Sequence, residues 1–392
     1  MTHDQPAEWT GKEIASVAMR TAFIYTDAYF DYDYGPTHPL KIYRLKLAYE
    51  LIEAYGLLNL PSVQFIQTRK AEEDELALFH SRDYLQVLRD ANGGELVRSG
   101  YRYGLGPGDN PVFKGVYDWS AWATGATLQA GELVANGKKE IAFNIAGGLH
   151  HADSGRASGF CYVNDVVVGI LKLVNRGKRV AYVDFDAHHG DGVQRAFYRS
   201  NQVLTISLHE AGYALFPGTG FEHEIGEEAG KGYAVNLPFP PFSDDEVYVW
   251  AFEEIVPPLL QAFRPDIVVT QLGVDTFHSD PLTNLHLSIR GFERVVRRLK
   301  DLAPHWVALG GGGYDVSNVA RAWTLAWAVM NGAELDENLP ESYVEKSARF
   351  GIHDKKLRGA PFKSQRADSE VRREVERVVK SLKETVFPIV SG

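Results

Sequence analysis

The chain has 392 residues, of which 45% are hydrophobic, so it can bury a large core and needs no disulfide framework of the kind found in small secreted domains. Its 51 acidic side chains outnumber the 41 basic ones and give a net charge of -10, which argues against general nucleic-acid binding, a role that needs a basic surface. Cys161 is the single cysteine, which excludes an intrachain disulfide and a thiolate-rich metal site. Any metal ligands must therefore come from histidines and acids.

The first twenty residues are polar and carry acidic side chains early. They lack the basic start and apolar centre of a secretory signal, and no apolar run in the chain approaches the roughly 20 residues that span a bilayer. We therefore expect residues 1–20 to be an N-terminal extension of a cytoplasmic protein that has no membrane partner.

Strand-like and helical patterns alternate along most of the chain. Residues 22–25 predict a short first strand, and residues 41–55, with apolar side chains near helical spacing, predict a helix that Gly56 ends. Further helices are expected between strands, at residues 115–135, 162–175, 244–263, 289–302 and 318–330. This alternation indicates an α/β fold built around a parallel sheet.

Four apolar, strand-like segments lead directly into groups that bind metals or protons. They are residues 141–151, 180–191, 267–275 and 306–314. In an open α/β sheet the ligand site lies beyond the carboxyl ends of the parallel strands. Histidine, aspartate and tyrosine side chains at four strand ends can therefore converge on one point, which indicates an enzyme with a metal there.

Beyond Gly332 the sequence becomes more polar and charged, and apolar order returns near the end. Apolar side chains then recur at three- and four-residue spacing, at Val371, Val375, Val378, Val379, Leu382 and Val386. This stripe predicts a helix packed on the surface of the preceding domain.

The first group of candidate ligands follows the strand-like residues 180–184. Asp184 and Asp186 are two residues apart at a strand end, so their side chains start on the same side, and His188 follows two residues later. Asp275 ends another apolar segment and can supply a third ligand beside Asp186 and His188. Two carboxylates, one imidazole and an open position suit a catalytic zinc, although ferrous iron or manganese would also accept this oxygen-rich set.

A pair of histidines follows the segment at residues 141–146. His150 and His151 come after two glycines that allow a sharp turn, and we expect the adjacent imidazoles to point in different directions. Asp184 and Asp191 are the natural acceptors for their far nitrogens. A poised histidine beside a metal can take a proton from water and deliver it to a leaving amine, which is the chemistry of amide hydrolysis.

A phenol follows the fourth segment. Tyr314 comes directly after four glycines at residues 310–313, and its hydroxyl could donate to the oxyanion that forms when water attacks a carbonyl. The glycines alone would also suit a phosphate-binding loop, but the Lys-Ser/Thr of that motif does not follow them.

Taken together, six motifs resemble those of the zinc-dependent histone deacetylase family, nearest to its class I enzymes and their bacterial relatives, the histone-deacetylase-like and acetoin-utilisation proteins. In order they are GGLHHA, SGFCYVNDV, DFDAHHGDG, LFPGTG, LGVDTFHSDPL and LGGGGY. The resemblance implies the arginase/deacetylase fold, a parallel sheet of about eight strands with helices on both faces. It makes residues 21–332 the catalytic domain and residues 333–392 a C-terminal extension.

The resemblance also implies a role for each candidate. The zinc ligands would be Asp186, His188 and Asp275, and the oxyanion donor would be Tyr314. His151 would be the general base and acid and His150 its electrostatic partner, with Asp184 and Asp191 as their supporting carboxylates. The family's narrow acyl-lysine channel would be formed by Gly159, Phe160 and Phe216, with Asp109 holding the substrate backbone at the rim and Leu282 at the mouth.

Monovalent cation sites, usually for potassium, are a further property of this family. The inner site matches Asp184, Asp186, His188, Ser207 and Leu208, and the outer one matches Phe197, Ser200, Val203 and Tyr233. Arginase-like enzymes share the fold but hold two manganese ions with additional aspartates. Gly190 and Phe277 stand where those acids would be expected, so the sequence predicts one metal.

The sequence therefore predicts a zinc hydrolase that removes acetyl or other acyl groups from lysine side chains of a protein or peptide. An amidohydrolase for acetylpolyamines or other N-acyl amines is the alternative. Leu282 disfavours this alternative, because polyamine-preferring relatives carry an acid at the matching position. A catalytically silent module that recognises acyl-lysine is a third reading, which the full set of catalytic groups disfavours.

Overall fold

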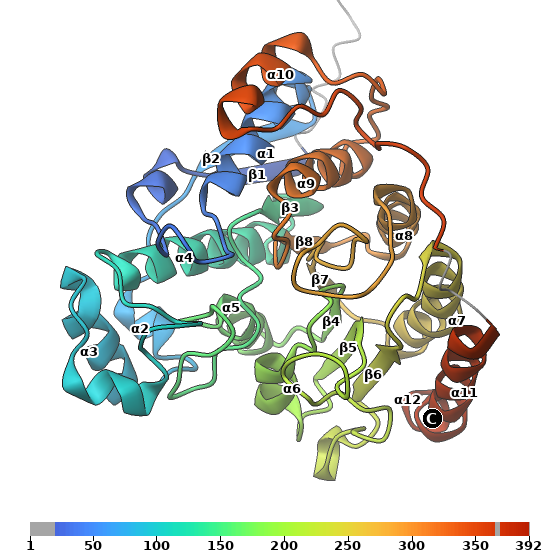
Figure 1. Ribbon diagram of the computed structural model, residues 1–392. Coiled ribbons are helices and arrows are strands. Elements are labelled where there is room, and N and C mark those ends of the chain that lie inside the picture. Colours follow the sequence, from blue (N-terminus) through green and yellow to red (C-terminus); the bar gives the residue numbers. More distant parts are fainter. Residues whose placement is uncertain (1–19, 365–368, 392) are drawn as a thin grey trace, which may run out of the picture.

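The computed structural model describes residues 20–364 and 369–391, in which eight strands form one parallel sheet (Figure 1). Its strand order is β2-β1-β3-β8-β7-β4-β5-β6. The strands are β1 (Thr21–Tyr25), β2 (Val63–Gln67), β3 (Ile141–Asn144), β4 (Val180–Asp184), β5 (Val203–Glu210), β6 (Ala234–Phe239), β7 (Ile267–Gln271) and β8 (Trp306–Leu309). The predicted α/β fold with a parallel sheet of eight strands is confirmed.

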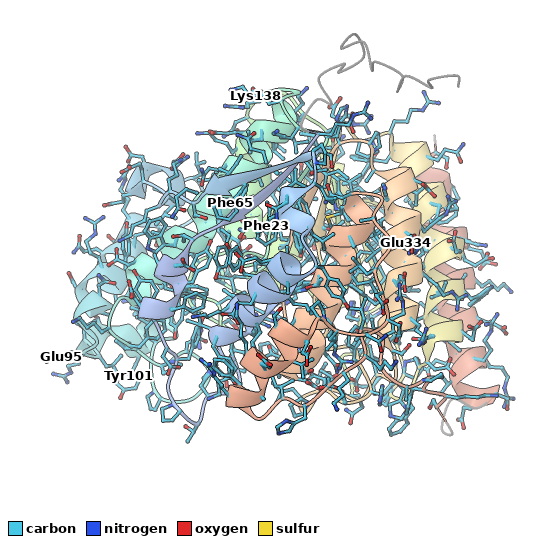
Figure 2. All side chains as sticks on the ribbon, turned by 90° about the horizontal axis from the view of Figure 1, so that it is seen from above. Phe23, Phe65, Glu95, Tyr101, Lys138 and Glu334 are labelled. Carbon is cyan, nitrogen blue, oxygen red and sulfur yellow. The ribbon has the colours of Figure 1, made fainter. Side chains whose placement is uncertain are left out.

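Helices cover both faces of this sheet. They are α1 (Tyr43–Ala54), α2 (Glu73–Leu76), α3 (Arg82–Asp90), α4 (Val116–Ala135), α5 (Asp165–Val174), α6 (Asp191–Phe197), α7 (Asp245–Phe263), α8 (Ile289–Leu302), α9 (Val316–Met330), α10 (Glu341–Ser347), α11 (Ser369–Thr385) and α12 (Phe387–Val390). On one face α1, α9, α8 and α7 pack side by side in that order, followed by α11 (Figure 2). Helices α4, α5 and α6 pack against the other face.

Alternation along the strands divides the core between the two faces. Ala22 and Ile24 of β1 pack with the α4–α6 layer, whereas Phe23 and Tyr25 pack with the opposite layer. This is the period-two geometry of a strand buried on both faces. It explains why these short strands are apolar almost throughout.

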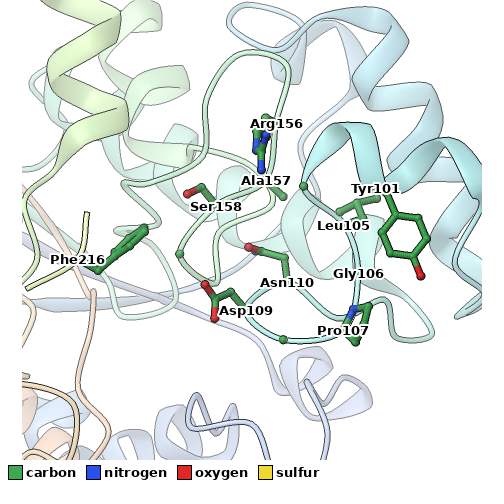
Figure 3. A pocket seen from close by; sticks show the side chains of 13 residues that line it. Tyr101, Leu105, Gly106, Pro107, Asp109, Asn110, Arg156, Ala157, Ser158 and Phe216 are labelled. Carbon is green, nitrogen blue, oxygen red and sulfur yellow. The ribbon is translucent and has the colours of Figure 1, made fainter. Parts of the chain in front are cut away.

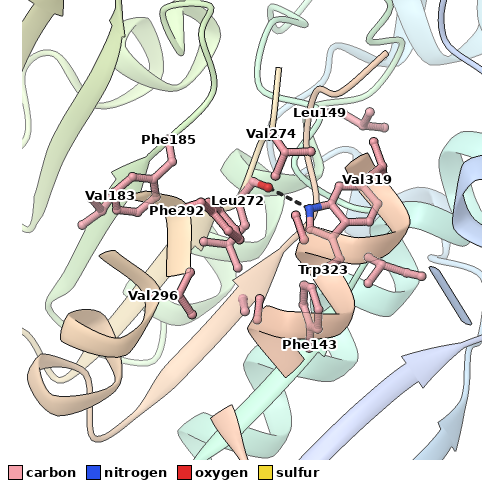
Figure 4. Packing of buried hydrophobic residues seen from close by; sticks show 14 of the residues in the cluster. Phe143, Leu149, Val183, Phe185, Leu272, Val274, Phe292, Val296, Val319 and Trp323 are labelled. Carbon is pink, nitrogen blue, oxygen red and sulfur yellow. Dashed lines mark hydrogen bonds between the residues drawn. The ribbon is translucent and has the colours of Figure 1, made fainter. Parts of the chain in front are cut away.

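The layer that contains α9 lies directly beneath the loops that follow β7 and β8. Trp323 of α9 is fully buried, and its indole Nε1 donates to the carbonyl oxygen of Leu272, 2.8 Å away (Figure 4). Val274 and Val319 lie close to the same indole in Figure 4. Because this indole is buried and its single N–H donor is bonded to Leu272, Trp323 fixes the backbone just after β7.

Most helices lie where the sequence predicts them, with small differences at the ends. The predicted helix at 162–175 begins only at Asp165, because residues 158–161 form a turn and the Asn164 side chain caps the helix by accepting from the Val167 N–H. Helix α1 ends at Ala54, and Gly56 adopts a left-handed conformation with φ of 72°. That conformation favours glycine and is typical of a residue just past a helix end.

The apolar stripe near the end of the chain lies on α11 and the turn after it. Val375, Val378 and Leu382 are buried, and α11 packs against α7 and the edge strand β6. Ion pairs join its charged flank to the neighbouring elements, including Arg377 with Glu222 at 2.5 Å and Lys383 with Glu254. The helix therefore covers one edge of the sheet. The predicted N-terminal extension lies outside the described residues, apart from Arg20.

None of the helices in residues 20–364 and 369–391 combines the length and the apolar composition that crossing a bilayer requires.

The strand order has one consequence for the site. Strands β3, β8, β7 and β4 are neighbours at the centre of the sheet, and they are the four strands whose following loops carry the predicted chemical groups. Because all strands are parallel, these four loops leave the sheet at the same edge.

Candidate active site

Three buried side chains meet beyond the ends of β4 and β7. The donor atoms of Asp186, His188 and Asp275 all lie within 4.8 Å of one another. The Nδ1 atom of His188 is 3.0 Å from Asp186 Oδ1 and 3.0 Å from Asp275 Oδ2. Two carboxylate oxygens and one imidazole nitrogen therefore point at a common centre.

The remaining carboxylate oxygens are held by neighbouring groups. Asp186 Oδ2 accepts from Gln271 Nε2 at 2.6 Å and from the Gly312 N–H at 2.7 Å. Asp275 Oδ1 accepts from the Ala187 N–H at 2.8 Å. Such outer contacts orient ligands and leave one oxygen of each carboxylate directed at the centre. The sequence did not reveal Gln271, because a glutamine at a strand end carries no distinctive signal.

The charges of this group fit a divalent cation. Burial and the nearby Asp186 carboxylate raise the pKa of Asp275 to about 8, so without a cation the two acids compete to be ionised. A single His188 Nδ1 proton can satisfy only one of them well. Two oxygens and one imidazole nitrogen are a donor set that zinc accepts, and they leave room for water or substrate.

Two histidine–aspartate pairs stand beside the ligands. His150 Nδ1 lies 2.7 Å from Asp184 Oδ2, and His151 Nδ1 lies 2.8 Å from Asp191 Oδ1. The Nε2 atoms of the two rings are 3.0 Å apart. The expectation that the imidazoles point in different directions thus holds for their Nδ1 atoms and is wrong for their Nε2 atoms, which meet.

The two imidazoles differ in electrostatic surroundings. Burial lowers the pKa of His150, but the carboxylates of Asp184 and Asp186 outweigh burial and raise it to about 9. Burial and the charge of His150 lower the pKa of His151 to about 4, although Asp191 opposes this. Near neutral pH the pair therefore holds one proton on His150 and leaves His151 free to accept another.

The loop that carries the two histidines is held by Asn164 and Asp165. Asn164 Nδ2 donates to the carbonyl oxygens of His150 and Ala152, both at 3.0 Å. The Asp165 carboxylate accepts from the N–H groups of Gly148 and Leu149. Both residues lie in the SGFCYVNDV motif, which marked them in the sequence without indicating this contact.

Tyr314 stands on a glycine loop that a buried arginine holds. Arg44 of α1 donates to the carbonyl oxygens of Gly313 at 2.8 Å and Gly311 at 2.7 Å. The Tyr314 N–H donates to Asp280 Oδ2 at 2.8 Å. Burial and the nearby Asp275 and Asp186 carboxylates raise the pKa of Tyr314 well above its usual value, so its hydroxyl stays protonated and able to donate.

Two phenyl rings stand close to the histidines and the tyrosine. The Phe216 ring centre is 5.1 Å from that of His151, and the Phe160 ring centre is 5.7 Å from that of Tyr314. Gly159 has a positive φ of 51°, and a Cβ there would lie 2.4 Å from the His151 ring. A glycine is therefore required where this loop passes the imidazole.

Leu282 lies on the loop between β7 and α8 and is half-buried. Its N–H donates to Asp280 Oδ1 at 3.0 Å, so the carboxyl that holds the Tyr314 backbone also holds Leu282. Asp109 is exposed on a separate loop, where its carbonyl oxygen is 3.2 Å from His38 Nε2.

A pocket of about 540 Å³ adjoins the two walls of the predicted channel. Gly159, Phe216 and Asp109 line it together with Arg156 and Tyr101. Figure 3 shows Asp109 and Arg156 on different loops, with Ser158 and Asn110 between them in that view. The pocket is thus continuous with the loop that packs on His151.

The positions predicted to bind monovalent cations lie at both ends of β5. Ser207 pairs with Asp184 across β5 and β4, and Leu208 follows it. At the other end, Phe197 closes α6, Val203 opens β5, and the carbonyl oxygen of Tyr233 accepts from the Thr205 N–H at 2.9 Å. The Ser200 N–H donates to the Phe197 carbonyl oxygen at 2.9 Å. Potassium binding at these positions stays a prediction.

The model of the histone deacetylase domain matches residues 38–330. The chain belongs to the histone deacetylase family. Among curated relatives, acetoin utilization protein AcuC of Bacillus subtilis is 38% identical over 334 residues, which cover 83% of this chain and 86% of that protein. Histone deacetylase RPD3 of Saccharomyces cerevisiae is 38% identical over 324 residues, covering 82% and 74%.

Solved structures of histone deacetylase relatives share the fold. A crystal structure of a histone deacetylase homologue from Aquifex aeolicus has a TM-score of 0.84 at 36% identity and covers 92% of this chain and 100% of its own. A structure of such a homologue complexed with SAHA has a TM-score of 0.83 at 36% identity, with the same coverage. The resemblance read from the six motifs is confirmed, and the chain is a hydrolase of this family.

The structure also bears on the two-metal arrangement of arginase-like enzymes. Phe277 is buried in the core, with its ring centre 5.9 Å from that of Phe292, and a Cβ on Gly190 would lie 2.4 Å from Asp184 Oδ2. Within residues 20–364 and 369–391, Asp186, His188 and Asp275 are the one group of this kind able to hold a metal. That there is one metal per chain stays a prediction.

Proposed function

We propose that this protein is a zinc-dependent deacylase that removes acetyl groups from lysine side chains of proteins or peptides. The observation that carries the proposal is the meeting of His150 and His151 at 3.0 Å, each backed by its own aspartate, beside three convergent metal ligands. This is the set of groups that metal-assisted amide hydrolysis requires.

Zinc would be held by Asp186, His188 and Asp275, where it would acidify a water and polarise the acyl carbonyl. Neutral His151 accepts a proton from the attacking water, and protonated His150 offsets the negative charge that develops. His151 then returns a proton to the leaving lysine amine. Asp191 and Asp184 fix the tautomer and orientation of the two rings throughout.

The remaining groups position and stabilise the substrate. The Tyr314 hydroxyl donates to the oxyanion. Phe160 and Phe216 enclose the aliphatic stem of the acyl-lysine and keep water away from it, and Asp109 accepts from the substrate backbone at the rim. Leu282 borders the mouth, where an apolar side chain gives no attraction to a polycationic amine. The protein would act in the cytoplasm, where its one thiol, on the buried Cys161, stays reduced.

The proposal is tested by assaying the purified, zinc-loaded protein on an acetyl-lysine peptide and on acetylated polyamines side by side. We expect hydrolysis of the peptide, loss of turnover with a chelator, and recovery when zinc is restored. Elemental analysis should show about one zinc per chain. Preference for the polyamines would support the small-molecule amidohydrolase instead, and chelator-resistant turnover would contradict the metal mechanism.

A further inference from the structure

The pocket beside the predicted channel is lined by one acidic and one basic side chain. The proposed function gives a role to the acid, Asp109, and none to the base. Arg156 and Asp109 line it, and the other lining residues are uncharged. Both charged residues are exposed. Arg156 is the one basic side chain among the residues that line the pocket.

The backbone places Arg156 firmly at the edge of the pocket. It pairs with Asp153 in an antiparallel bridge that closes a tight turn, and the next residue, Ala157, donates its N–H to the Tyr103 carbonyl oxygen at 2.9 Å. Gly104, with φ of 78°, lies against the arginine: a Cβ there would be 3.0 Å from Arg156 Cγ. The aliphatic stem of Arg156 therefore lies against Gly104, and Arg156 is one of the residues that line the pocket.

The guanidinium is not neutralised by the protein around it. Among the ion pairs of the described residues, none joins Arg156 to an acid within 4.0 Å, and the acid nearest in sequence, Asp153, pairs with Arg195 at 3.1 Å. The Asp109 carboxylate likewise makes no ion pair in this part of the chain. An unpaired guanidinium offers a planar set of donors that matches a carboxylate.

We propose that this pocket selects substrates that carry a carboxylate next to the acyl-lysine, with Arg156 as the residue that binds it. The inference rests on the proposed deacylase function, because it assumes that the acyl-lysine side chain enters between Phe160 and Phe216. The substrate backbone then lies at the rim, with an N–H toward Asp109 and the carboxylate toward Arg156. The carboxylate is either that of a neighbouring aspartate or glutamate or the α-carboxylate of a terminal or free acyl-lysine.

Matched substrates separate these two sources. One pair has glutamate or glutamine beside an internal acetyl-lysine, tested on each side of it. The other pair has a C-terminal acetyl-lysine with a free carboxylate or a carboxamide. For at least one pair we expect kcat/KM about fivefold higher for the carboxylate, carried by KM, since a partly exposed charge pair contributes modestly. The pair that shows this ratio identifies the source.

Variants then assign the preference to Arg156. Arg156→Gln should bring the ratio to about one while leaving kcat on the neutral peptide unchanged, and Arg156→Lys should keep part of it. The matched control is Arg102→Gln, which removes the same charge from an exposed neighbouring residue that does not line the pocket. The control should keep the wild-type ratio.

Two results would overturn the inference: equal kcat/KM within every pair for the wild type, or an equal fall in the ratio for Arg156→Gln and Arg102→Gln. Turnover of the neutral peptide reports on the proposed function separately. The dissociation constants of the same pairs are therefore also measured, by fluorescence anisotropy of labelled peptides. A lower constant for the carboxylate peptide supports the inference and equal constants contradict it, even if no peptide is hydrolysed.

Discussion

The pKa values of two adjacent histidines shift in opposite directions because different charged groups face the two buried rings. His150 faces Asp184 and Asp186, which favour its proton, whereas His151 faces Asp191 and the charge of His150. Two imidazoles with pKa values of about 9 and about 4 thus have their Nε2 atoms 3.0 Å apart. Separating two like groups by their environments is a common way to run acid–base chemistry near neutral pH.

Replacing Tyr314 by Phe tests the oxyanion role at the level of one atom. The phenyl ring keeps the packing on Phe160 and removes the hydroxyl, so we expect kcat on an acetyl-lysine peptide to fall about 100-fold or more. Zinc content, measured by elemental analysis, should stay at the wild-type level. Turnover that survives the change would show that another group stabilises the oxyanion.

Arg195 holds the carboxylate behind His151. Its Nη1 lies 2.8 Å from Asp191 Oδ2 and its Nε lies 3.1 Å from Asp153 Oδ2. Part of the Asp191 charge is therefore offset by a cation that the sequence did not single out. Removing that cation leaves the carboxylate more negative toward His151 and favours the protonated ring.

We therefore expect Arg195→Gln to raise the pKa of His151. The acid limb of the kcat/KM profile reports this base, so it should move to higher pH by up to about one unit. Arg199→Gln is the control, because Arg199 lies just beyond the end of α6 and pairs with Glu227. A profile that falls in height without moving along the pH axis would indicate a purely structural role for Arg195.

Connections between the elements also hold the site. His80 lies on the connection between α2 and α3 and is buried. Its Nε2 accepts from the Asn164 N–H at 3.0 Å, and its Nδ1 lies 3.2 Å from the Ser154 carbonyl oxygen. A neutral ring satisfies both contacts. Asn164 Nδ2 in turn donates to the carbonyl oxygen of His150, so the His80 imidazole supports the loop that carries His150 and His151.

The pH dependence of stability should reveal this contact. Burial lowers the pKa of His80 to about 4, below the usual 6.5, so the unfolded chain takes up this proton first as the pH falls. The stabilisation is complete above pH 6.5 and is lost as the pH falls toward 4, by about 3 kcal/mol for the full shift.

A His80→Gln variant should therefore lose less stability than the wild type between pH 6.5 and 4. Urea unfolding at a series of pH values measures the difference. His305→Gln changes an exposed histidine and should leave the slope unchanged. Parallel curves for His80→Gln and the wild type would mean that His80 is not held neutral.

For the molecule as a whole, zinc bound at Asp186, His188 and Asp275 would link stability to the metal. Asp186 and Asp275 are fully or almost fully buried, and a bound divalent ion would balance their charges. Because a ligand that binds the folded state stabilises it by mass action, removing zinc with a chelator should lower Tm by on the order of 10 °C.

Asp275→Asn gives the matched comparison. The variant removes one of the two competing charges, so its metal-free form should melt higher than the metal-free wild type, while added zinc should raise its Tm much less. Differential scanning calorimetry with and without chelator measures both. A wild-type Tm that does not respond to the chelator would contradict a stabilising metal at these residues.

Much of the fold could be predicted from the sequence. The strands and helices were predictable because buried strands such as residues 180–184 and amphipathic helices such as α8 have strong periodicity. The fold and the family followed from six ordered motifs. The convergence of Asp186, His188 and Asp275 was an expectation that followed from their places at ends of parallel strands.

Contacts between distant segments were not predictable in the same way. Arg44 is far in the sequence from the glycine loop that it holds, and its charge would ordinarily indicate an exposed residue. The same holds for the contacts of Gln271, Arg195 and His80, because no local sequence pattern indicates their partners. The approach of the two Nε2 atoms depends on the turn at Gly147 and Gly148 and on Asp165, which only the folded chain brings together.

The central position of β3, β8, β7 and β4 has a consequence for how the enzyme would be inactivated. Each of these strands has a paired neighbour on both sides, so fraying that starts at β2 or β6 does not reach them until the inner sheet separates. Interior strands of this kind exchange their amide protons last. As the urea concentration rises, hydrolysis should therefore persist until the whole sheet unfolds cooperatively. No folded but inactive form should accumulate at lower urea concentrations.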